Sequence, residues 1–99
     1  METFGEKIRR LREKKGIYLR QVASFLEIDQ ALLSKIERGE RKAQRNQVIK
    51  LAHFYKSNKD EFLTSWLSDK VVYDLDCEKN AIEVLKVAEE KIKYKRSLQ

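Results

Sequence analysis

Residues 22–39 read VASFLEIDQALLSKIERG, and this stretch decides the fold. Two short segments have apolar residues at helical spacing. The first runs from Leu19, just before this stretch, to Leu26, and the second runs from Asp29 to Arg38. The Asp29 carboxylate can accept hydrogen bonds from the free N–H groups of the second segment, and Gly39 suits the left-handed residue that ends a helix. Two short helices joined by so few residues predict a helix-turn-helix.

The two predicted helices have complementary faces. Ala23 offers a small side chain where the second helix must cross close over the first. The apolar seam between the pair and the rest of the protein consists of Val22, Leu26, Ile28, Leu33 and Ile36. The residues of the second helix that are left facing outward are Gln30, Ala31, Ser34, Lys35 and Arg38. Such a face suits DNA, because Gln pairs with adenine, Ala contacts the thymine methyl group and Lys reaches guanine or phosphate. The alternative is that its charges are simply solvated.

The rest of the chain also has the pattern of helices. With 3 glycines and no proline, it lacks the turn residues that are typical of β proteins. Further helices are expected at residues 4–15, 45–55, from Asn58 onward, and at 77–97. Residues 71–75 could form a strand by residue type, but one short strand has no partner, so we expect a helix or an extended linker there. We expect Trp66 to pack its helix against the C-terminal segment.

The composition excludes several classes of protein. A chain of 99 residues is shorter than those that divide into several large domains. One cysteine and one histidine cannot form an intramolecular disulfide or a structural zinc site, so no metal or cofactor is expected. No nucleophile and base, and no phosphate-binding loop, stand at a usable spacing, so we do not expect an enzyme. No apolar run approaches the length of a membrane span, and no signal-peptide core is present, so we expect a cytoplasmic protein.

The charges are distributed unevenly along the chain, whose net charge is +6. Residues 1–45 hold 12 Lys and Arg against 7 acidic residues, whereas residues 59–90 hold 4 Lys against 9 acidic residues. A basic region of this kind is the electrostatic footprint of a polyanionic partner such as DNA. From charge alone, a solvated lysine-rich surface is the alternative interpretation.

Residues 22–39 resemble the helix-turn-helix of the Xre-type, lambda-repressor-like family of bacterial and phage transcription regulators. The ending LSKIERG, at residues 33–39, is the most specific part of this resemblance. Residues 8–16, 48–52 and 60–63 resemble the first, fourth and fifth helices of the family. The resemblance covers about residues 4–67 and implies an all-α, five-helix lambda-repressor-like DNA-binding domain, to which this chain adds a long C-terminal helix.

The resemblance also implies which residues contact DNA. In that family the third helix enters the major groove, which implies base contacts by Gln30, Ala31, Leu32, Ser34 and Lys35. Contacts with DNA phosphates are implied for Arg38 and for the basic loop residues Arg41, Lys42 and Arg45.

Two positions depart from the family pattern. The second helix of the family often starts with a small cap and a phosphate-binding glutamine, where this chain has Tyr18 and Leu19, and Arg20 is the nearest substitute. The turn often holds a left-handed glycine, where this chain has Glu27. Asp29 also adds an acid beside the groove, and we interpret it first as a helix cap and second as an acceptor for cytosine.

The C-terminal segment has an apolar stripe that is wider than one small domain needs for packing. We therefore expect a second chain to cover it, giving a dimer, and the alternative is a helix that lies wholly on its own domain. The residues expected at the dimer interface are Ala81, Val84, Leu85, Ala88 and Ile92. The expected domains are a DNA-binding domain at residues 1–68 and a C-terminal helical extension for dimerisation at residues 69–99.

These features predict a homodimeric, sequence-specific DNA-binding transcriptional regulator that acts on a palindromic operator. A two-fold dimer reads two half-sites about one helical turn apart, which multiplies the discrimination of a single helix-turn-helix. Repression and activation both stay open. The compact form resembles phage repressors and the controller proteins of restriction-modification systems. The alternative function is an antitoxin-like module that binds a partner protein as well as DNA, so a protein partner, either polymerase or a toxin, also stays open.

Overall fold

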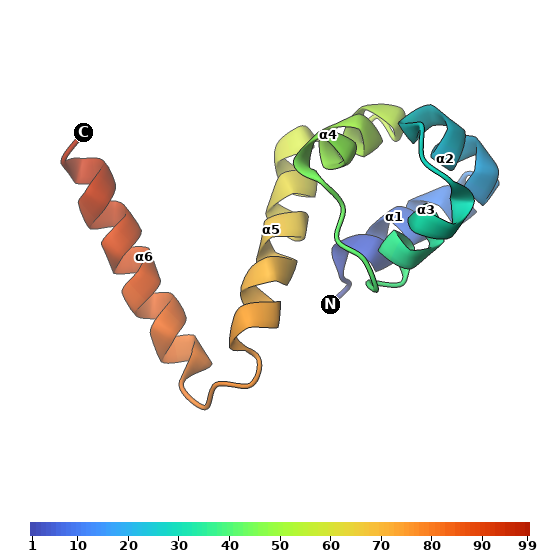
Figure 1. Cartoon of the computed structure of the whole chain (residues 1–99). Helices are drawn as coiled ribbons and strands as arrows, with labels where there is room; N and C mark the ends of the chain where they lie inside the picture. Colours follow the sequence, from blue (N-terminus) through green and yellow to red (C-terminus); the bar gives the residue numbers. More distant parts are fainter. The chain divides into compact units, whose positions relative to one another are not determined.

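The computed structural model describes residues 1–99 and contains six α-helices and no strand. The helices are α1 (Phe4–Lys14), α2 (Leu19–Leu26), α3 (Gln30–Glu37), α4 (Arg45–Phe54), α5 (Lys59–Leu75) and α6 (Ala81–Ser97) (Figure 1). The chain divides into unit 1 (Met1–Asp69) and unit 2 (Lys70–Gln99), and α5 crosses the boundary between them. The expected all-α fold is confirmed.

Most helices begin and end within one residue of their predicted limits, but two regions differ. Residues 71–75 are helical as the last part of α5, so of the two expected forms, a helix or an extended linker, the helix is the one found. The last helix begins at Ala81 rather than at Cys77. Between the helices the backbone turns, with Glu78 N donating to Leu75 O at 2.9 Å. Asp and Asn side chains in this segment compete with helix formation, and Cys77 is exposed in the turn.

The hydrophobic core lies in unit 1. Its buried residues are Phe4, Ile8, Val22, Ala23, Leu26, Leu33, Ile36, Ala43, Val48, Leu51, Ala52, Tyr55, Phe62 and Trp66. The predicted seam of the helix-turn-helix is confirmed, because Val22, Leu26, Leu33 and Ile36 are buried and Ile28 packs against them half-buried. Phe62 is fully buried and meets Phe4 edge to face, with ring centroids 5.8 Å apart.

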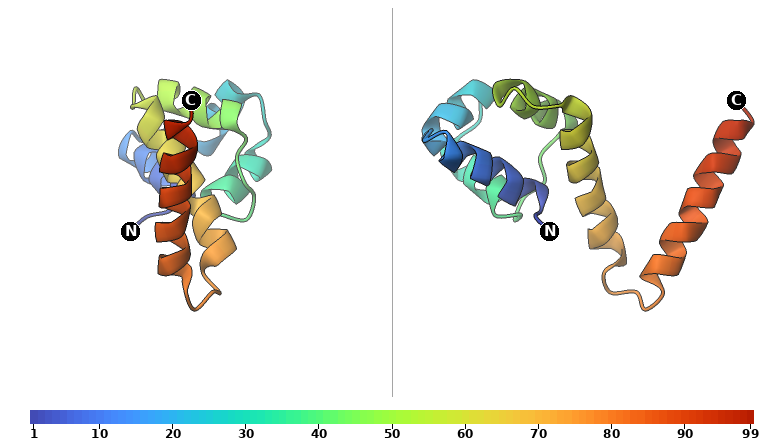
Figure 2. Two further views of the ribbon diagram at one scale, coloured as in Figure 1. Left: turned by 90° about the vertical axis from the view of Figure 1, so that its left-hand side faces the viewer. Right: turned by 180° about the vertical axis from the view of Figure 1, so that it is seen from behind.

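Helices α1 and α3 lie side by side, as both Figure 1 and the rear view of Figure 2 show. Gly5 allows this close approach, since a Cβ atom at this position would lie 2.5 Å from the carbonyl oxygens of both Ile36 and Glu37. The backbone N–H of Phe4 donates to the Asp69 carboxylate at 2.8 Å, which ties the start of α1 to α5. The first helix is therefore fixed against two other helices of unit 1.

A bidentate ion pair joins α1 to the last residue of α3. Arg12 Nε donates to Glu37 Oε2 at 2.9 Å, and Arg12 Nη2 donates to Glu37 Oε1 at 3.1 Å. The Glu37 side chain is only 4% exposed. Arg12 Nη1 also donates to Ile17 O at 3.1 Å, in the connection that leads to α2. The hydrogen bond to Glu37 raises the pKa of the Arg12 guanidinium, so one charged group connects three parts of unit 1.

Tyr55, which follows α4, is buried close to this ion pair. Its Oη atom has no hydrogen-bond partner in the chain. The pKa of Tyr55 is raised to about 12, chiefly by burial, with the Glu37 carboxylate acting in the same direction and Arg12 offsetting part of the effect. The phenol therefore stays neutral in the folded protein until strongly alkaline pH.

Unit 2 contains the end of α5 and the whole of α6, and no residue of α6 is buried. The exposed large apolar side chains of this unit are Val71, Val72, Tyr73, Ile82, Leu85, Val87, Ile92, Tyr94 and Leu98. None of the six helices has both the length and the apolar character needed to cross a membrane.

The first prediction concerns the buried ion pair. We expect Glu37→Ala to lower the free energy of unfolding by about 3 kcal/mol, because it leaves the Arg12 guanidinium in a largely buried site without its partner. The matched control is Glu13→Ala, which breaks the exposed ion pair with Arg9 and should change stability little. Chemical denaturation measures both values, and similar losses in the two variants would contradict the importance of the Arg12–Glu37 pair.

The second prediction concerns Tyr55 at alkaline pH. Because the pKa of Tyr55 is about 12 in the folded chain and 10.0 for an unperturbed tyrosine, its contribution to stability is complete below pH 10 and is lost as the pH rises towards 12. Over that interval we expect wild type to lose about 2–3 kcal/mol more than Tyr55→Phe. At neutral pH the variant should be at least as stable, since it removes a buried hydroxyl that lacks a partner. Identical pH profiles in urea denaturation would show that the phenol does not titrate in this way.

Candidate DNA-binding interface

The connection between α2 and α3 has the geometry of a helix-turn-helix. Glu27 occupies the left-handed region, with φ 59° and ψ 41°, and its N–H donates to Ser24 O at 3.1 Å. The next residue, Ile28, donates to Ala23 O at 3.0 Å and so closes the end of α2. The family often places glycine at this turn, and Glu27 adopts the left-handed conformation at a modest cost in strain. Ala23 is buried under the crossing, as expected for the small residue of the first helix.

Asp29 is the N-cap of α3. Its Oδ1 atom accepts a hydrogen bond from the backbone N–H of Leu32 at 2.7 Å. This contact confirms the first interpretation of Asp29, because the carboxylate satisfies one of the free donors at the start of the helix. The cap fixes the residue at which α3 begins and therefore which side chains face outward.

The predicted base-contacting residues occupy the outer side of α3, with one exception. Gln30, Ala31 and Lys35 are exposed, and Ser34 is partly exposed. The side chains of Gln30 and Lys35 form no hydrogen bond, ion pair or ring contact within the chain. Leu32 differs, because it is half-buried and packs against the core. Helical spacing brings residues 30, 31, 34 and 35 onto one face, and their roles in reading DNA are taken up below.

The basic residues after α3 lie on a loop that is attached to the helix. The N–H groups of Glu40 and Arg41 both donate to Lys35 O, at 2.8 and 3.3 Å. Arg38, the C-cap of α3, forms an exposed ion pair with Glu40. The pair uses the Nε atom of Arg38, so its Nη groups stay available to a phosphate, beside a carboxylate that already offsets part of the positive charge.

Trp66 holds the next part of this loop. The indole N–H donates to Ala43 O at 2.9 Å, and the guanidinium carbon of Arg45 lies 5.6 Å from the indole ring centroid. Both interactions lie within unit 1. A buried indole needs an acceptor for its N–H, and the carbonyl of Ala43 meets that need. Trp66 thus positions the loop that carries three of the predicted phosphate-contacting residues.

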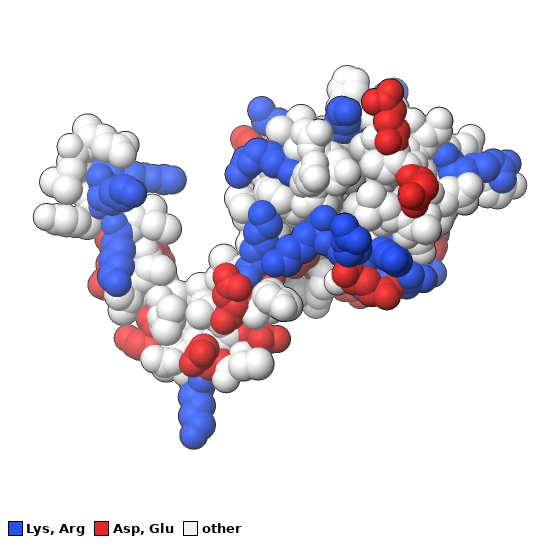
Figure 3. All heavy atoms as spheres, in the orientation of Figure 1, with Lys and Arg blue, Asp and Glu red and all other residues white.

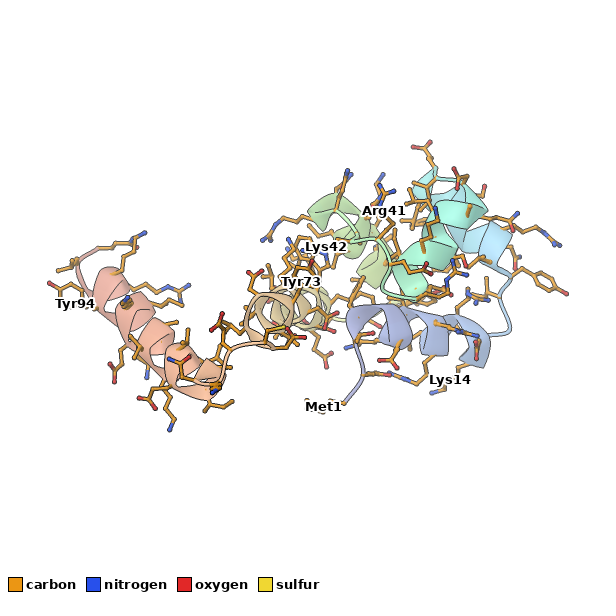
Figure 4. The ribbon with its side chains drawn as sticks, turned by 60° about the horizontal axis from the view of Figure 1, so that its bottom comes forward. Met1, Lys14, Arg41, Lys42, Tyr73 and Tyr94 are labelled. Atoms are coloured by element: carbon orange, nitrogen blue, oxygen red, sulfur yellow. The ribbon has the colours of Figure 1, made fainter.

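Basic side chains gather on one face of unit 1 (Figure 3). Arg41 and Lys42 are exposed and lie next to each other on the loop between α3 and α4 (Figure 4). Figure 3 shows Lys and Arg atoms in a band across one face of unit 1. Basic side chains gathered on one face supply positive potential, to which a phosphate backbone is attracted.

At the start of α2, Tyr18 interacts with Arg20, the nearest substitute for the phosphate-binding glutamine of the family. The Arg20 guanidinium lies 4.6 Å from the centre of the Tyr18 ring, and both residues are exposed. The Gln21 side chain accepts from Tyr18 N at 2.7 Å, so this glutamine caps its own helix. Arg20 is therefore the residue at this helix start that offers a cation to solvent.

Comparison with known proteins agrees with this geometry. A family model described as a helix-turn-helix domain matches residues 3–63. A relative, the HTH-type transcriptional repressor RghR of Bacillus subtilis (strain 168), is 38% identical over 50 residues. That match covers 50% of this chain and 37% of the relative, so the chain spans well under two thirds of the relative's length. The resemblance to Xre-type regulators is confirmed, and the chain belongs to the helix-turn-helix domain family.

Proposed function

We propose that this protein is a transcriptional regulator that binds a palindromic DNA operator as a homodimer. The observation that carries the proposal is the outer face of α3, where Gln30, Ala31, Ser34 and Lys35 lie exposed or partly exposed beside a basic loop. Amide, methyl, hydroxyl and ammonium groups on one helix match the edges of bases in the major groove. The proposal describes a regulator and not an enzyme, acting in the cytoplasm where its DNA would lie.

The phosphate contacts follow from the position of the basic side chains around α3. Arg41 and Lys42 lie on the loop after the helix, and Arg45 begins α4. Arg20 lies at the start of α2, so we assign it to a phosphate on the other side of the recognition helix. These contacts set affinity and orientation, whereas the uncharged side chains of α3 set the preferred sequence.

The homodimer is proposed from the surface of α6. Leu85 and Ile92 are 41% and 52% exposed, and Ala81, Val84 and Ala88 beside them are only partly covered. An apolar face of this extent on a charged helix favours association with a second chain. Two copies related by a two-fold axis would present two α3 helices to two half-sites of an operator.

We further propose that occupation of the operator represses transcription. The relative RghR is named as a repressor, and a bound dimer of this size can block access to a promoter. The restriction-modification controller role is a narrower form of the same proposal. The second candidate is the antitoxin-like function, which the exposed apolar face of α6 also favours. Copurification of a second polypeptide with this chain would support that candidate, whereas a pure homodimer would support the regulator.

The third prediction separates base contacts from phosphate contacts. We expect Gln30→Ala and Lys35→Ala each to weaken operator binding by about 1–3 kcal/mol and to relax its sequence preference. Arg41→Ala should weaken binding to operator and random DNA about equally, because it removes a phosphate contact. Titrations at fixed salt with an operator selected from random fragments measure these effects. Equal losses on both DNAs for all three variants would contradict the assignment.

The fourth prediction concerns the C-terminal helix. Removing the chain from Cys77 onward should leave a folded monomer, since every buried core residue lies in unit 1. Operator binding should become much weaker, because a single helix-turn-helix reads only one half-site. Analytical ultracentrifugation checks the mass, and circular dichroism checks that the helices remain. An unchanged dimer would refute the proposed role of α6.

A further inference from the structure

The loop between α3 and α4 is fixed at two points of its backbone. On the side of α3, the N–H groups of Glu40 and Arg41 donate to Lys35 O. On the side of α4, the Ala43 carbonyl accepts the indole N–H of Trp66 at 2.9 Å, and the Ala43 side chain is buried. Trp66 belongs to α5, so a helix outside the helix-turn-helix fixes the end of the loop that leads into α4.

The side chain of Arg45, the first residue of α4, lies over the same indole. Its guanidinium carbon is 5.6 Å from the ring centroid, within the range of a cation–π interaction. Arg45 is exposed and forms no hydrogen bond or ion pair within the chain. The indole therefore restricts the position of the guanidinium but carries no negative charge to neutralise it, and the N–H donors of Arg45 stay available to a phosphate.

Trp66 holds Arg45 in two ways, through the carbonyl of Ala43 two residues earlier and through the ring under the guanidinium. Trp66 itself is only 7% exposed, so any effect on DNA binding must pass through the groups that it holds. A side chain that is already ordered loses less conformational entropy when it binds.

We infer that Trp66 is a positioning residue for DNA binding, which prepares Arg45 to contact a phosphate without touching DNA itself. The inference rests on the proposed DNA-binding function and adds to it a residue of α5. Because a phosphate contact carries no sequence information, Trp66 contributes to affinity and not to the choice of sequence.

Replacing the indole by a smaller ring tests this role. Trp66→Phe keeps an aromatic side chain in the core, but it removes the donor to Ala43 O and part of the surface under Arg45. We expect binding to operator and to random DNA to weaken alike, roughly fivefold, because the phosphate contact is no longer prepared. The dependence of log affinity on log salt should become less steep by about one, as for the loss of one phosphate contact.

A core variant separates this effect from a loss of stability. Ile8→Val removes one methylene group from the core at α1 and should lower stability without changing the DNA affinity of the folded protein. Urea denaturation gives the folded fraction, so that every affinity refers to folded protein. If Trp66→Phe kept the wild-type affinity and salt dependence, or if Ile8→Val showed the same losses, the inference would be overturned and the proposed function would stand. A wild-type protein that binds no duplex would contradict both.

A double variant identifies the group through which Trp66 acts. Arg45→Ala alone should weaken binding to both DNAs, because it removes the phosphate contact. In the Arg45→Ala background, Trp66→Phe should cost less than about a further twofold, since the contact that it prepares is already absent. Losses that simply multiply would overturn the inference.

Indole emission provides a measurement without any variant of Trp66. Trp66 is the one tryptophan of the chain, so selective excitation reports on the ring under Arg45. A phosphate bound to Arg45 changes the electric field at this ring, and saturating duplex DNA should therefore shift the emission maximum. The shift should fall at least twofold in Arg45→Ala. The matched control is Arg41→Ala, which removes a cation of the same loop that forms no ring contact, and it should keep the full shift. No shift in wild type, or equal shifts in the two variants, would overturn the inference.

Discussion

The placement of the recognition helix depends on the ion pair between Arg12 and Glu37. An isolated helix as short as α3, with 8 residues, is marginal in water and cannot hold its own orientation. The buried carboxylate of Glu37, the last residue of α3, accepts a hydrogen bond from the Arg12 guanidinium of α1. Gly5 has no side chain, which lets the backbones of α1 and α3 approach closely. With the Asp29 cap at the other end, both ends of α3 are fixed. This is the rigidity that a surface for reading bases requires.

Local patterns predicted most of unit 1, and contacts between distant residues account for what they missed. The limits of α2 and α3 follow from apolar spacing, and the cap at Asp29 follows from residue type. Nothing local shows that Glu37 has a partner 25 residues earlier in the chain. In the same way, the acceptor of the Trp66 indole lies 23 residues away, and nothing local identifies it. Periodicity indicates that a side chain is buried, but it does not identify the groups around it.

The candidate site shows the same division. Helical spacing was sufficient to place residues 30, 31, 34 and 35 on one outer face, and Leu32 is the member of the set that the core partly covers. The partners of the cations could not be predicted, because ion pairs and ring contacts depend on side-chain conformation. Arg20 stacks on Tyr18, and Arg38 pairs with Glu40. From residue type alone, Arg20 and Arg38 would be expected to be equivalent cations with no partner in the chain.

The ion pair of Arg38 with Glu40 has a consequence for the thermodynamics of DNA binding. When a solvated cation neutralises a phosphate, condensed counterions leave the DNA and make affinity fall steeply with salt. A cation that already pairs with a carboxylate behaves differently, because a phosphate contact weakens that pair, and Glu40 then attracts cations from solution. The two ion movements partly cancel, and the affinity of this protein should therefore decline less steeply with ionic strength than its number of basic side chains suggests.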